Sequence, residues 1–171
     1  LVLDADALNI ISEDLDFLNI IRTKKNLILT PHPGEMLRLF PDAVDIQSQR
    51  LRILENFLEK HSPNFPSILL KGYRSMLGVL QNYQNIQEQD MQDGGKQKYR
   101  IFINPTGGPA LSKGGSGDVL SGMIASFCAQ GLQIWEAGIL AIFLHGLCAD
   151  VLVEKRGIDF DILPTDIINE I

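Results

Sequence analysis

The chain has 171 residues, 45% of them hydrophobic, and carries a formal net charge of −6 at pH 7. This length allows one sizeable core and is too short for two ordinary domains. The acidic balance argues against a nucleic-acid surface, which needs clustered lysine and arginine, so no nucleic-acid partner is expected.

The two cysteines, Cys128 and Cys148, lie in apolar helical runs. Buried reduced thiols typically have this setting, so we expect a reducing, cytoplasmic compartment rather than a secreted disulfide scaffold. No apolar run is expected to reach membrane-spanning length without interruption, which argues against a membrane partner. A targeting segment upstream of Leu1 is an open alternative.

The first apolar segment, residues 1–3, is predicted to be a buried strand that ends at Asp4 and Asp6. Ligands bind at the carboxyl ends of strands in open α/β sheets, so these carboxylates are candidate site residues. Turn formation or helix capping explains either aspartate at least as well.

A short helix is predicted over residues 12–21, capped by Ser12, and a second strand over residues 26–30. Strand, helix and strand in succession are typical of a parallel sheet. Two prolines and a glycine follow in the sequence TPHPG, and they fix a rigid turn that holds His32 outward. Taken alone, His32 is an ordinary loop histidine. Glu35 falls in the first turn of the next helix.

Residues 45–61 are predicted to form an amphipathic helix, to which we assign a packing role alone. Its buried face is expected to consist of Leu51, Leu54, Phe57 and Leu58, and its exposed face of Arg50, Arg52, Glu55 and Glu59. Pro63 and Pro66 follow the helix and end it.

Residues 67–70 are predicted to form a strand that ends at Lys71, and a lone lysine at a strand end is more commonly solvated than functional. Residues 76–80 and 99–103 are predicted to pair as a hairpin. The polar, glutamine-rich stretch 82–98 between them lacks periodicity, so we expect a mobile surface loop.

The chain is organised around residues 104–122, which read NPTGGPALSKGGSGDVLSG. Gly114, Gly115 and Gly117 precede an apolar run with helical spacing, so a flexible turn leads into a helix start. Backbone amides at such a junction attract anions, and phosphate is the expected ligand. A carboxylate repels phosphate, so Asp118 needs a separate reason to lie beside a phosphate site. A role as general base for a hydroxyl that attacks phosphorus would be such a reason. Helix capping by Asp118 explains the position about equally well.

Residues 119–129 and 135–153 are predicted to form two apolar helices that pack against the sheet, the first ended by Gly131. His145 lies in the second helix. A satisfied core histidine is the favoured interpretation there, and we assign it no functional role. Thr165 is predicted to cap a last helix.

The sequence NPTG followed by GGSGDVLSG resembles the anion hole and catalytic aspartate of ribokinase-like proteins. The segments LDADALN, TPHPGEMLRL and KGYRS extend the resemblance to the NAD(P)H-hydrate dehydratases, also called the carbohydrate-kinase-like family. The longer stretch 82–98 and Ser75 in place of the usual threonine are departures from the family pattern. The resemblance implies an α/β, ribokinase-like fold with a mostly parallel central sheet and helices on both faces.

The resemblance covers essentially the whole chain, but ribokinase-like domains place several strands before the segment with which this sequence begins. Residues 1–171 are therefore expected to be the C-terminal portion of one such domain. Residues 1–4 should then be an interior-type strand with one flank open or filled by other polypeptide. Alone, the 171 residues are expected to be poorly soluble and inactive.

The resemblance also implies the site residues, with Asp118 as the catalytic base and no metal ligand assigned. Nucleotide binding is implied for Lys71, Gly72, Tyr73, Arg74, Ser75, Gly108, Lys113, Gly114, Gly115, Ser116 and Gly117. Substrate binding is implied for His32, Pro33, Gly34, Glu35, Arg38 and Asp118, with Asp4, Asp6 and Asn9 as further substrate-side candidates.

The implied activity is repair of hydrated NADH or NADPH, in which the S-epimer loses water at the expense of ADP or ATP with Mg²⁺. The expected route is phosphorylation of the ring hydroxyl, with the amides of Gly115, Ser116 and Gly117 stabilising the phosphoryl group, and then elimination of phosphate. A homo-oligomer and a linked or separate NAD(P)H-hydrate epimerase are expected partners.

Two alternative functions stay open. One is a small-molecule kinase of the hydroxymethylpyrimidine or hydroxyethylthiazole type, which shares the Gly-Asp centre. The other is a nucleotide-binding module without turnover. A P-loop NTPase is excluded because the sequence contains no Walker A motif.

Overall fold

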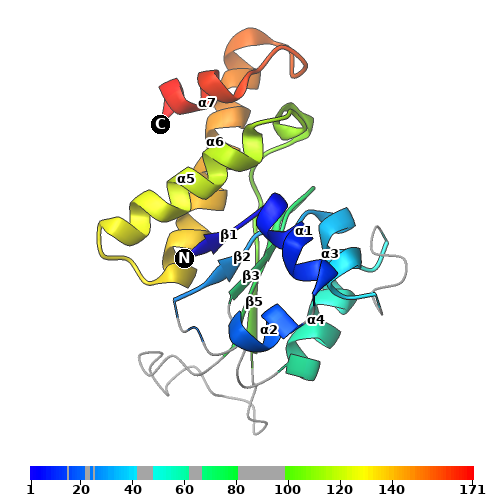
Figure 1. Cartoon of the computed structure of the whole chain (residues 1–171). Coiled ribbons are helices and arrows are strands. Elements are labelled where there is room, and N and C mark those ends of the chain that lie inside the picture. Colours follow the sequence, from blue (N-terminus) through cyan, green and yellow to red (C-terminus); the bar gives the residue numbers. More distant parts are fainter. Residues whose placement is uncertain (15, 22–23, 25, 42–47, 62–66, 81–98) are drawn as a thin grey trace, which may run out of the picture.

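Five strands form one mixed sheet at the centre of the fold (Figure 1). They are β1 (Val2–Leu3), β2 (Ile28–Leu29), β3 (Ser67–Leu70), β4 (Met76–Leu80) and β5 (Tyr99–Ile103), in that order across the sheet. The computed structural model describes residues 1–14, 16–21, 24, 26–41, 48–61, 67–80 and 99–171.

Four of these strands run in the same direction. The pairs β1–β2 and β2–β3 are parallel, whereas β4 is antiparallel to both β3 and β5, so β5 runs with the first three. The prediction of a mostly parallel sheet with a β4–β5 hairpin is confirmed. The stretch 82–98 lies outside the described residues.

Helices cover both faces of the sheet, as predicted (Figure 1). One face carries α1 (Asp6–Glu13), α2 (Asp16–Ile21), α3 (Pro33–Leu39) and α4 (Arg50–His61). The other carries α5 (Ser116–Ala129) and α6 (Ile134–Arg156), preceded by the short 3-10 helix η2 (Pro109–Leu111). The last helix, α7 (Pro164–Glu170), packs on the C-terminal half of α6.

Successive residues of the central strands point to opposite faces and so build two cores. Leu29, Ile68 and Leu70 pack against α1, α3 and α4, whereas Ile28 and Leu69 pack against α5 and α6. All five side chains are fully buried, which explains why these strands read as continuous apolar runs rather than alternating ones.

β1 forms an edge of the sheet. In the part of the chain that the structure describes, it pairs with β2 alone, and its other flank has no strand beside it. Leu1 extends the pairing, because its amino group donates to the carbonyl of Asn26 at 2.8 Å. The flank of β1 is open as expected for residues 1–4, but Val2 and Leu3 are only partly buried, unlike the residues of an interior strand.

The predictions for residues 12–21 and 45–61 need correction. Ser12 lies inside α1 and donates to the carbonyl of Asn9 at 2.6 Å, so it caps no helix. Helix α4 begins at Arg50 in the described residues, and residues 42–47 lie outside them. Its buried face includes Ile53 in place of Leu51, which is 40% exposed, because the helix is rotated relative to the predicted stripe.

The boundaries of the C-terminal helices also differ from the prediction. Helix α5 begins at Ser116, so the glycine-rich turn supplies its first helical residues. In α7, Thr165 lies within the first turn and does not cap it. The carboxylate of Asp166 accepts from the amide of Leu163 at 2.8 Å and takes that role instead.

Helix α6 is long and apolar enough to cross a membrane by length and composition, contrary to our expectation from the sequence. Half of the most apolar stretch of α6 is buried inside the fold, where the helix packs against α5 and the sheet. Its composition is therefore explained as that of a core helix. Cys148 of α6 and Cys128 of α5 are free, and burial raises the pKa of both thiols.

Candidate active site

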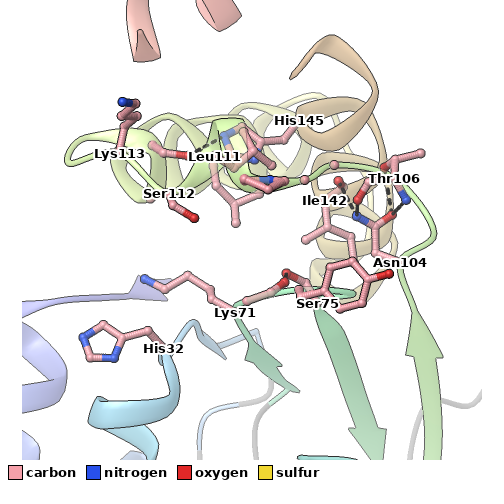
Figure 2. A pocket seen from close by; sticks show the side chains of 18 of the residues that line it. His32, Lys71, Ser75, Asn104, Thr106, Leu111, Ser112, Lys113, Ile142 and His145 are labelled. Atoms are coloured by element: carbon pink, nitrogen blue, oxygen red, sulfur yellow. Dashed lines mark hydrogen bonds between the residues drawn. The ribbon is translucent and has the colours of Figure 1, made fainter. Parts of the chain in front are cut away.

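A cavity of about 560 Å³ lies at the carboxyl ends of β2, β3 and β5, beside the start of α5 (Figure 2). Its walls come from the turns after these strands, from η2, and from α5 and α6. Lys71 and Ser75 lie on the sheet side and face Leu111 and Ser112 across the cavity. The volume suits a small-molecule ligand.

Lys71, at the carboxyl end of β3, joins the charged side chains at this edge of the sheet. Its Nζ lies 2.5 Å from Asp4 Oδ1 and 4.0 Å from Glu35 Oε2. Ser121 of α5 donates from Oγ to Asp4 Oδ2 at 3.0 Å. The Lys71 and Asp4 side chains are 19% and 14% exposed, so water and salt screen this pair weakly. Asp4 thus links β1, β3 and α5 and fixes the position of the Lys71 ammonium group.

His32 is the N-cap residue of α3. Its Nδ1 accepts hydrogen bonds from the amides of Gly34 at 2.9 Å and Glu35 at 3.2 Å. Glu35 Oε2 accepts from the His32 amide at 2.7 Å, which completes a capping box. Because Nδ1 is an acceptor, the proton of the neutral imidazole lies on Nε2, 3.4 Å from Glu35 Oε1. The TPHPG turn therefore presents a half-exposed imidazole of defined tautomer to the cavity.

Arg38 and Asn9 form a pair beside this turn, outside the residues that line the cavity. Asn9 Oδ1 accepts from Arg38 Nη2 at 2.8 Å and from Arg38 Nε at 3.2 Å, which ties α1 to α3. Asp6 lies exposed in the first turn of α1. A carboxylate is stabilised at the N-terminal end of a helix, so stabilisation of α1 explains the position of Asp6 without a ligand.

Arg50, predicted to lie on an exposed face, instead binds the turn after β3. Its guanidinium donates to the carbonyls of Leu70 at 3.1 Å and Lys71 at 3.0 Å, and to that of Tyr73. Gly72 has a φ of +132°, and a Cβ there would lie 3.2 Å from Arg50 Cζ. Glycine is thus required by the backbone conformation and by the close guanidinium. Burial lowers the pKa of Arg50.

The rest of the KGYRS turn is stabilised locally. Ser75 Oγ donates to the carbonyl of Gly72 at 3.0 Å. Tyr73 is 73% exposed, and the guanidinium of Arg74 lies 5.4 Å from the centre of its ring. Tyr73 and Ser75 line the cavity, whereas Arg74 does not.

The turn after β5 is bound to α6 (Figure 2). Asn104 Nδ2 donates to the carbonyls of Ile142 and Thr106, each at 3.0 Å, and Thr106 Oγ1 donates to the carbonyl of Phe143 at 2.8 Å. One turn along α6, Gly146 leaves no space for a side chain, because a Cβ there would lie 2.7 Å from the carbonyl carbon of Thr106. The NPTG turn and α6 therefore meet at backbone contact and form one wall of the cavity.

The glycine-rich turn enters α5 through Gly115, which has a left-handed φ of +90°. Among the described residues, no hydrogen bond engages the amides of Gly115 and Gly117, whereas the Ser116 amide donates to the carbonyl of Lys113 at 3.2 Å. Free amides at a helix start attract anions. Two of the three amides that we expected to face a phosphoryl group are thus available.

Asp118 and Lys113 flank this junction in different ways. Asp118 lies in the first turn of α5 with an exposed side chain that does not line the cavity. Lys113 lines the cavity, but its Nζ donates to the carbonyl of Phe160 at 2.6 Å and is directed away from the cavity in Figure 2. The expected phosphate contact of Lys113 therefore competes with a bond to the C-terminal segment.

His145 of α6 lines the cavity beside the start of α5. Its Nε2 lies 3.3 Å from Ser116 Oγ, and each of the two residues is 5% exposed. Burial lowers the pKa of His145 to about 4, and a hydrogen bond to the backbone of Ser116 opposes that shift. The interpretation as a buried, satisfied histidine is confirmed, and the structure adds that the residue borders the cavity.

Comparison with known proteins identifies the family to which the chain belongs. A model of the NAD(P)H-hydrate dehydratase family matches residues 1–92 and 94–171. The chain belongs to this family. It is 36% identical, over 97% of its length and 50% of the relative's, to the ADP-dependent (S)-NAD(P)H-hydrate dehydratase of Neisseria meningitidis. It is also 38% identical, over 91% of its length and 26% of the relative's, to the bifunctional NAD(P)H-hydrate repair enzyme Nnr of Moorella thermoacetica.

Solved structures of related proteins show the same fold. The ADP/ATP-dependent NAD(P)H-hydrate dehydratase from Bacillus subtilis, co-crystallised with ATP and Mg²⁺, matches 99% of this chain with a TM-score of 0.67 and 25% identity. A ribokinase-like superfamily protein from Enterococcus faecalis matches 98% with a TM-score of 0.69 and 28% identity. The ribokinase-like fold is confirmed. The chain spans about half the length of these two structures and of the Neisseria relative.

The structure brings together part of the site expected for an NAD(P)H-hydrate dehydratase. Among the expected residues, the following line the cavity: His32, Pro33, Lys71, Gly72, Tyr73, Ser75, Gly108, Lys113, Ser116 and Gly117. Others lie outside its lining: Asp4, Asp6, Asn9, Gly34, Glu35, Arg38, Arg74, Gly114, Gly115 and Asp118.

Several lining residues were not among the predicted site residues: Asn104, Thr106, Gly107, Pro109, Leu111, Ser112, Leu120, Ile142 and His145. Asn104 and Thr106 belong to the NPTG motif, so the motif itself was a signal for them. Ile142 and His145 come from an apolar helix whose pattern indicates packing alone.

Burial of His145 predicts a pH dependence of stability in the dehydratase fold. Because the pKa of His145 is about 4 in the folded chain and near 6.5 when unfolded, the unfolded state binds more protons between these values, and stability decreases as the pH is lowered. The loss from pH 7 to 4.5 should be on the order of 2 kcal/mol. Urea unfolding should show a shallower loss for His145→Gln than for wild type, and equal losses would contradict the assignment.

Proposed function

We propose that the protein carrying this chain repairs hydrated NADH or NADPH, returning the S-epimer to the reduced dinucleotide at the expense of ADP or ATP. One observation carries the proposal. A single cavity is lined by the TPHPG turn with His32, by the turn after β3 with Lys71, and by the start of α5 with the free amide of Gly117. The names of its relatives support the same activity.

The proposed reaction has two steps. Asp118 accepts the proton of the ring hydroxyl, whose oxygen forms a bond to the terminal phosphorus of the nucleotide as the bond from that phosphorus to the leaving nucleotide breaks. The new phosphate ester then leaves with the carbon–oxygen electron pair, and the neighbouring ring carbon loses a proton, which restores the double bond. The amides of Gly115 and Gly117 and the ammonium of Lys71 would stabilise the phosphoryl charge.

The side chains at the cavity fit a nucleotide with Mg²⁺ better than a metal held by protein alone. Among the described residues, no group of three or more histidine, cysteine, aspartate or glutamate side chains could hold a metal ion. Mg²⁺ usually binds through substrate phosphates with one or two carboxylates, so the phosphates of a bound nucleotide would bring the ion to this cavity. Bound in this way, the ion would screen the charge of the transferring phosphoryl group.

The proposal is tested with purified full-length protein and hydrated NADH. We expect recovery of the NADH absorbance that depends on ADP or ATP with Mg²⁺, with one free phosphate released for each NADH formed. A small-molecule kinase would instead yield a stable phosphorylated product and restore no absorbance. Nucleotide binding without any turnover would favour the non-catalytic module.

Replacing His32 and Lys71 one at a time should show which ligand each residue binds. His32→Ala should raise the KM for hydrated NADH, because His32 is assigned to the dinucleotide. Lys71→Ala should raise the KM for ADP or ATP, because a charged contact to phosphate contributes about 1.5–3 kcal/mol. Steady-state kinetics with one ligand varied at a time measures both. If both variants change the KM of the same ligand, this division of the cavity is wrong.

We further propose that a linked or separate NAD(P)H-hydrate epimerase works with this enzyme, which the bifunctional repair enzymes among its relatives support. The homo-oligomer and the cytoplasmic compartment stay predictions. Size-exclusion chromatography with light scattering tests the first, and fractionation of cells tests the second.

A further inference from the structure

His145 occupies a junction between three elements that form the cavity. The carbonyls of Ile142 and Phe143, in the preceding turn of α6, accept hydrogen bonds from Asn104 and Thr106. The neighbouring Gly146 touches the backbone of Thr106. Since α6 is held against the NPTG turn on this side, the imidazole of His145 is presented to the start of α5 in a fixed position.

Ser116 is the residue that His145 meets there. Its side chain lies within hydrogen-bond distance of the imidazole, and both groups are almost completely buried at the cavity wall. The backbone amide of Ser116 is already used by the carbonyl of Lys113, unlike the amides of Gly115 and Gly117 on either side. Any contribution of Ser116 to binding an anion at this helix start therefore comes from its hydroxyl group.

The direction of the bond between the two side chains decides what that hydroxyl can do. A serine hydroxyl has one proton to donate and two lone pairs. If the imidazole donates to Ser116 Oγ, the hydroxyl proton is left for a ligand in the cavity. If the imidazole accepts instead, that proton is consumed and the hydroxyl offers an anion no donor.

We propose that His145 is a positioning residue that donates from Nε2 to Ser116 Oγ and so turns the Ser116 hydroxyl proton toward a phosphate group of the bound nucleotide. This inference rests on the proposed function, because it deepens the nucleotide half of the same cavity. It adds a third donor beside the amides of Gly115 and Gly117. The strong burial of His145 keeps the imidazole neutral at the pH of the reaction, so its role is to orient and not to supply charge.

The test measures binding of ADP and ATP, with Mg²⁺, to the full-length protein by calorimetry, together with the KM of each substrate. Ser116→Ala should weaken nucleotide binding about tenfold, as expected for one hydrogen bond to a charged group. His145→Phe keeps the volume without the donor and should weaken binding by a similar factor. The double variant should be no weaker than either single variant, since both changes remove the same donor. The KM for hydrated NADH should stay unchanged.

Two further variants separate positioning from packing. His145→Gln retains an N–H donor and should bind nucleotide within about threefold of wild type, because the bond to Ser116 can be remade. Cys148→Ala, one turn along α6 and outside the cavity lining, should lower the melting temperature without changing nucleotide binding. If His145→Phe fails to fold, Ser116→Ala and His145→Gln still decide the question.

Three results would overturn the inference: wild-type binding in Ser116→Ala, equal weakening by Phe and Gln at position 145, or about a hundredfold loss in the double variant from two independent tenfold losses. The proposed function fails by a different result. If wild type binds ADP or ATP but does not dehydrate hydrated NADH, the reaction assignment is wrong while the binding comparison still judges His145. Absence of nucleotide binding to wild type would overturn both.

Discussion

Asp118→Asn is expected to lower turnover of hydrated NADH by about a hundredfold or more, the usual loss when a general base is removed. Asparagine preserves the shape of the side chain but cannot accept the hydroxyl proton. The side chain is exposed in the first turn of α5 and makes no hydrogen bond within the described residues, so folding stability should change little. Affinity for ADP or ATP should also change little, because the phosphate contacts come from neighbouring groups.

The control for this variant is Asp16→Asn, which makes the same change in the exposed first turn of α2. Its turnover should match that of wild type. Single-turnover measurements with saturating nucleotide isolate the chemical step from product release. Activity of Asp118→Asn comparable to wild type would remove the proposed base.

Gly146→Ala is expected to cost about 3 kcal/mol of folding stability, at the upper end of the usual cost of overpacking. A Cβ at this position would lie 2.3 Å from Thr106 Oγ1 and 2.7 Å from the Thr106 carbonyl carbon, so a rotamer change cannot relieve the overlap. The NPTG turn must move away from α6, which displaces one wall of the cavity. Nucleotide binding should weaken in the same variant.

A matched substitution in the neighbouring helix gives the opposite expectation. Gly122 lies in α5, and a Cβ there would meet nothing within 4 Å. Gly122→Ala should therefore stabilise the fold by about 0.5–1 kcal/mol through helix propensity. Urea unfolding of the two variants measures both effects. A stability of Gly146→Ala equal to that of wild type would show that the close contact between α6 and the NPTG turn is absent in solution.

Local patterns in the sequence predict much of this fold. Apolar runs located the strands, and the glycines before Asp118 located the start of α5. The TPHPG and KGYRS segments follow β2 and β3, whose carboxyl ends meet at one edge of the sheet. Because of this topology, residues that were predicted from their position at the end of a strand line a common cavity.

Contacts between distant residues could not be predicted in the same way. Arg50 lies on an amphipathic helix, where nothing in the periodicity indicates that its guanidinium binds the carbonyls after β3. The pairing of Asp4 with Lys71 joins residues 67 positions apart. His145 looks like a core residue because its helix is apolar, and its contact with Ser116 follows from how α6 crosses the start of α5.

The most direct measurement is a crystal structure of the full-length protein with ADP and Mg²⁺ bound. We expect the phosphates at the start of α5, within hydrogen-bond distance of the amides of Gly115 and Gly117, with Asp118 facing the open side of the terminal phosphate. The nucleotide should lie against Lys71, leaving the His32 side of the cavity free for the dinucleotide. Phosphates bound elsewhere, with these amides facing water, would contradict the assignment of the cavity and the mechanism built on it.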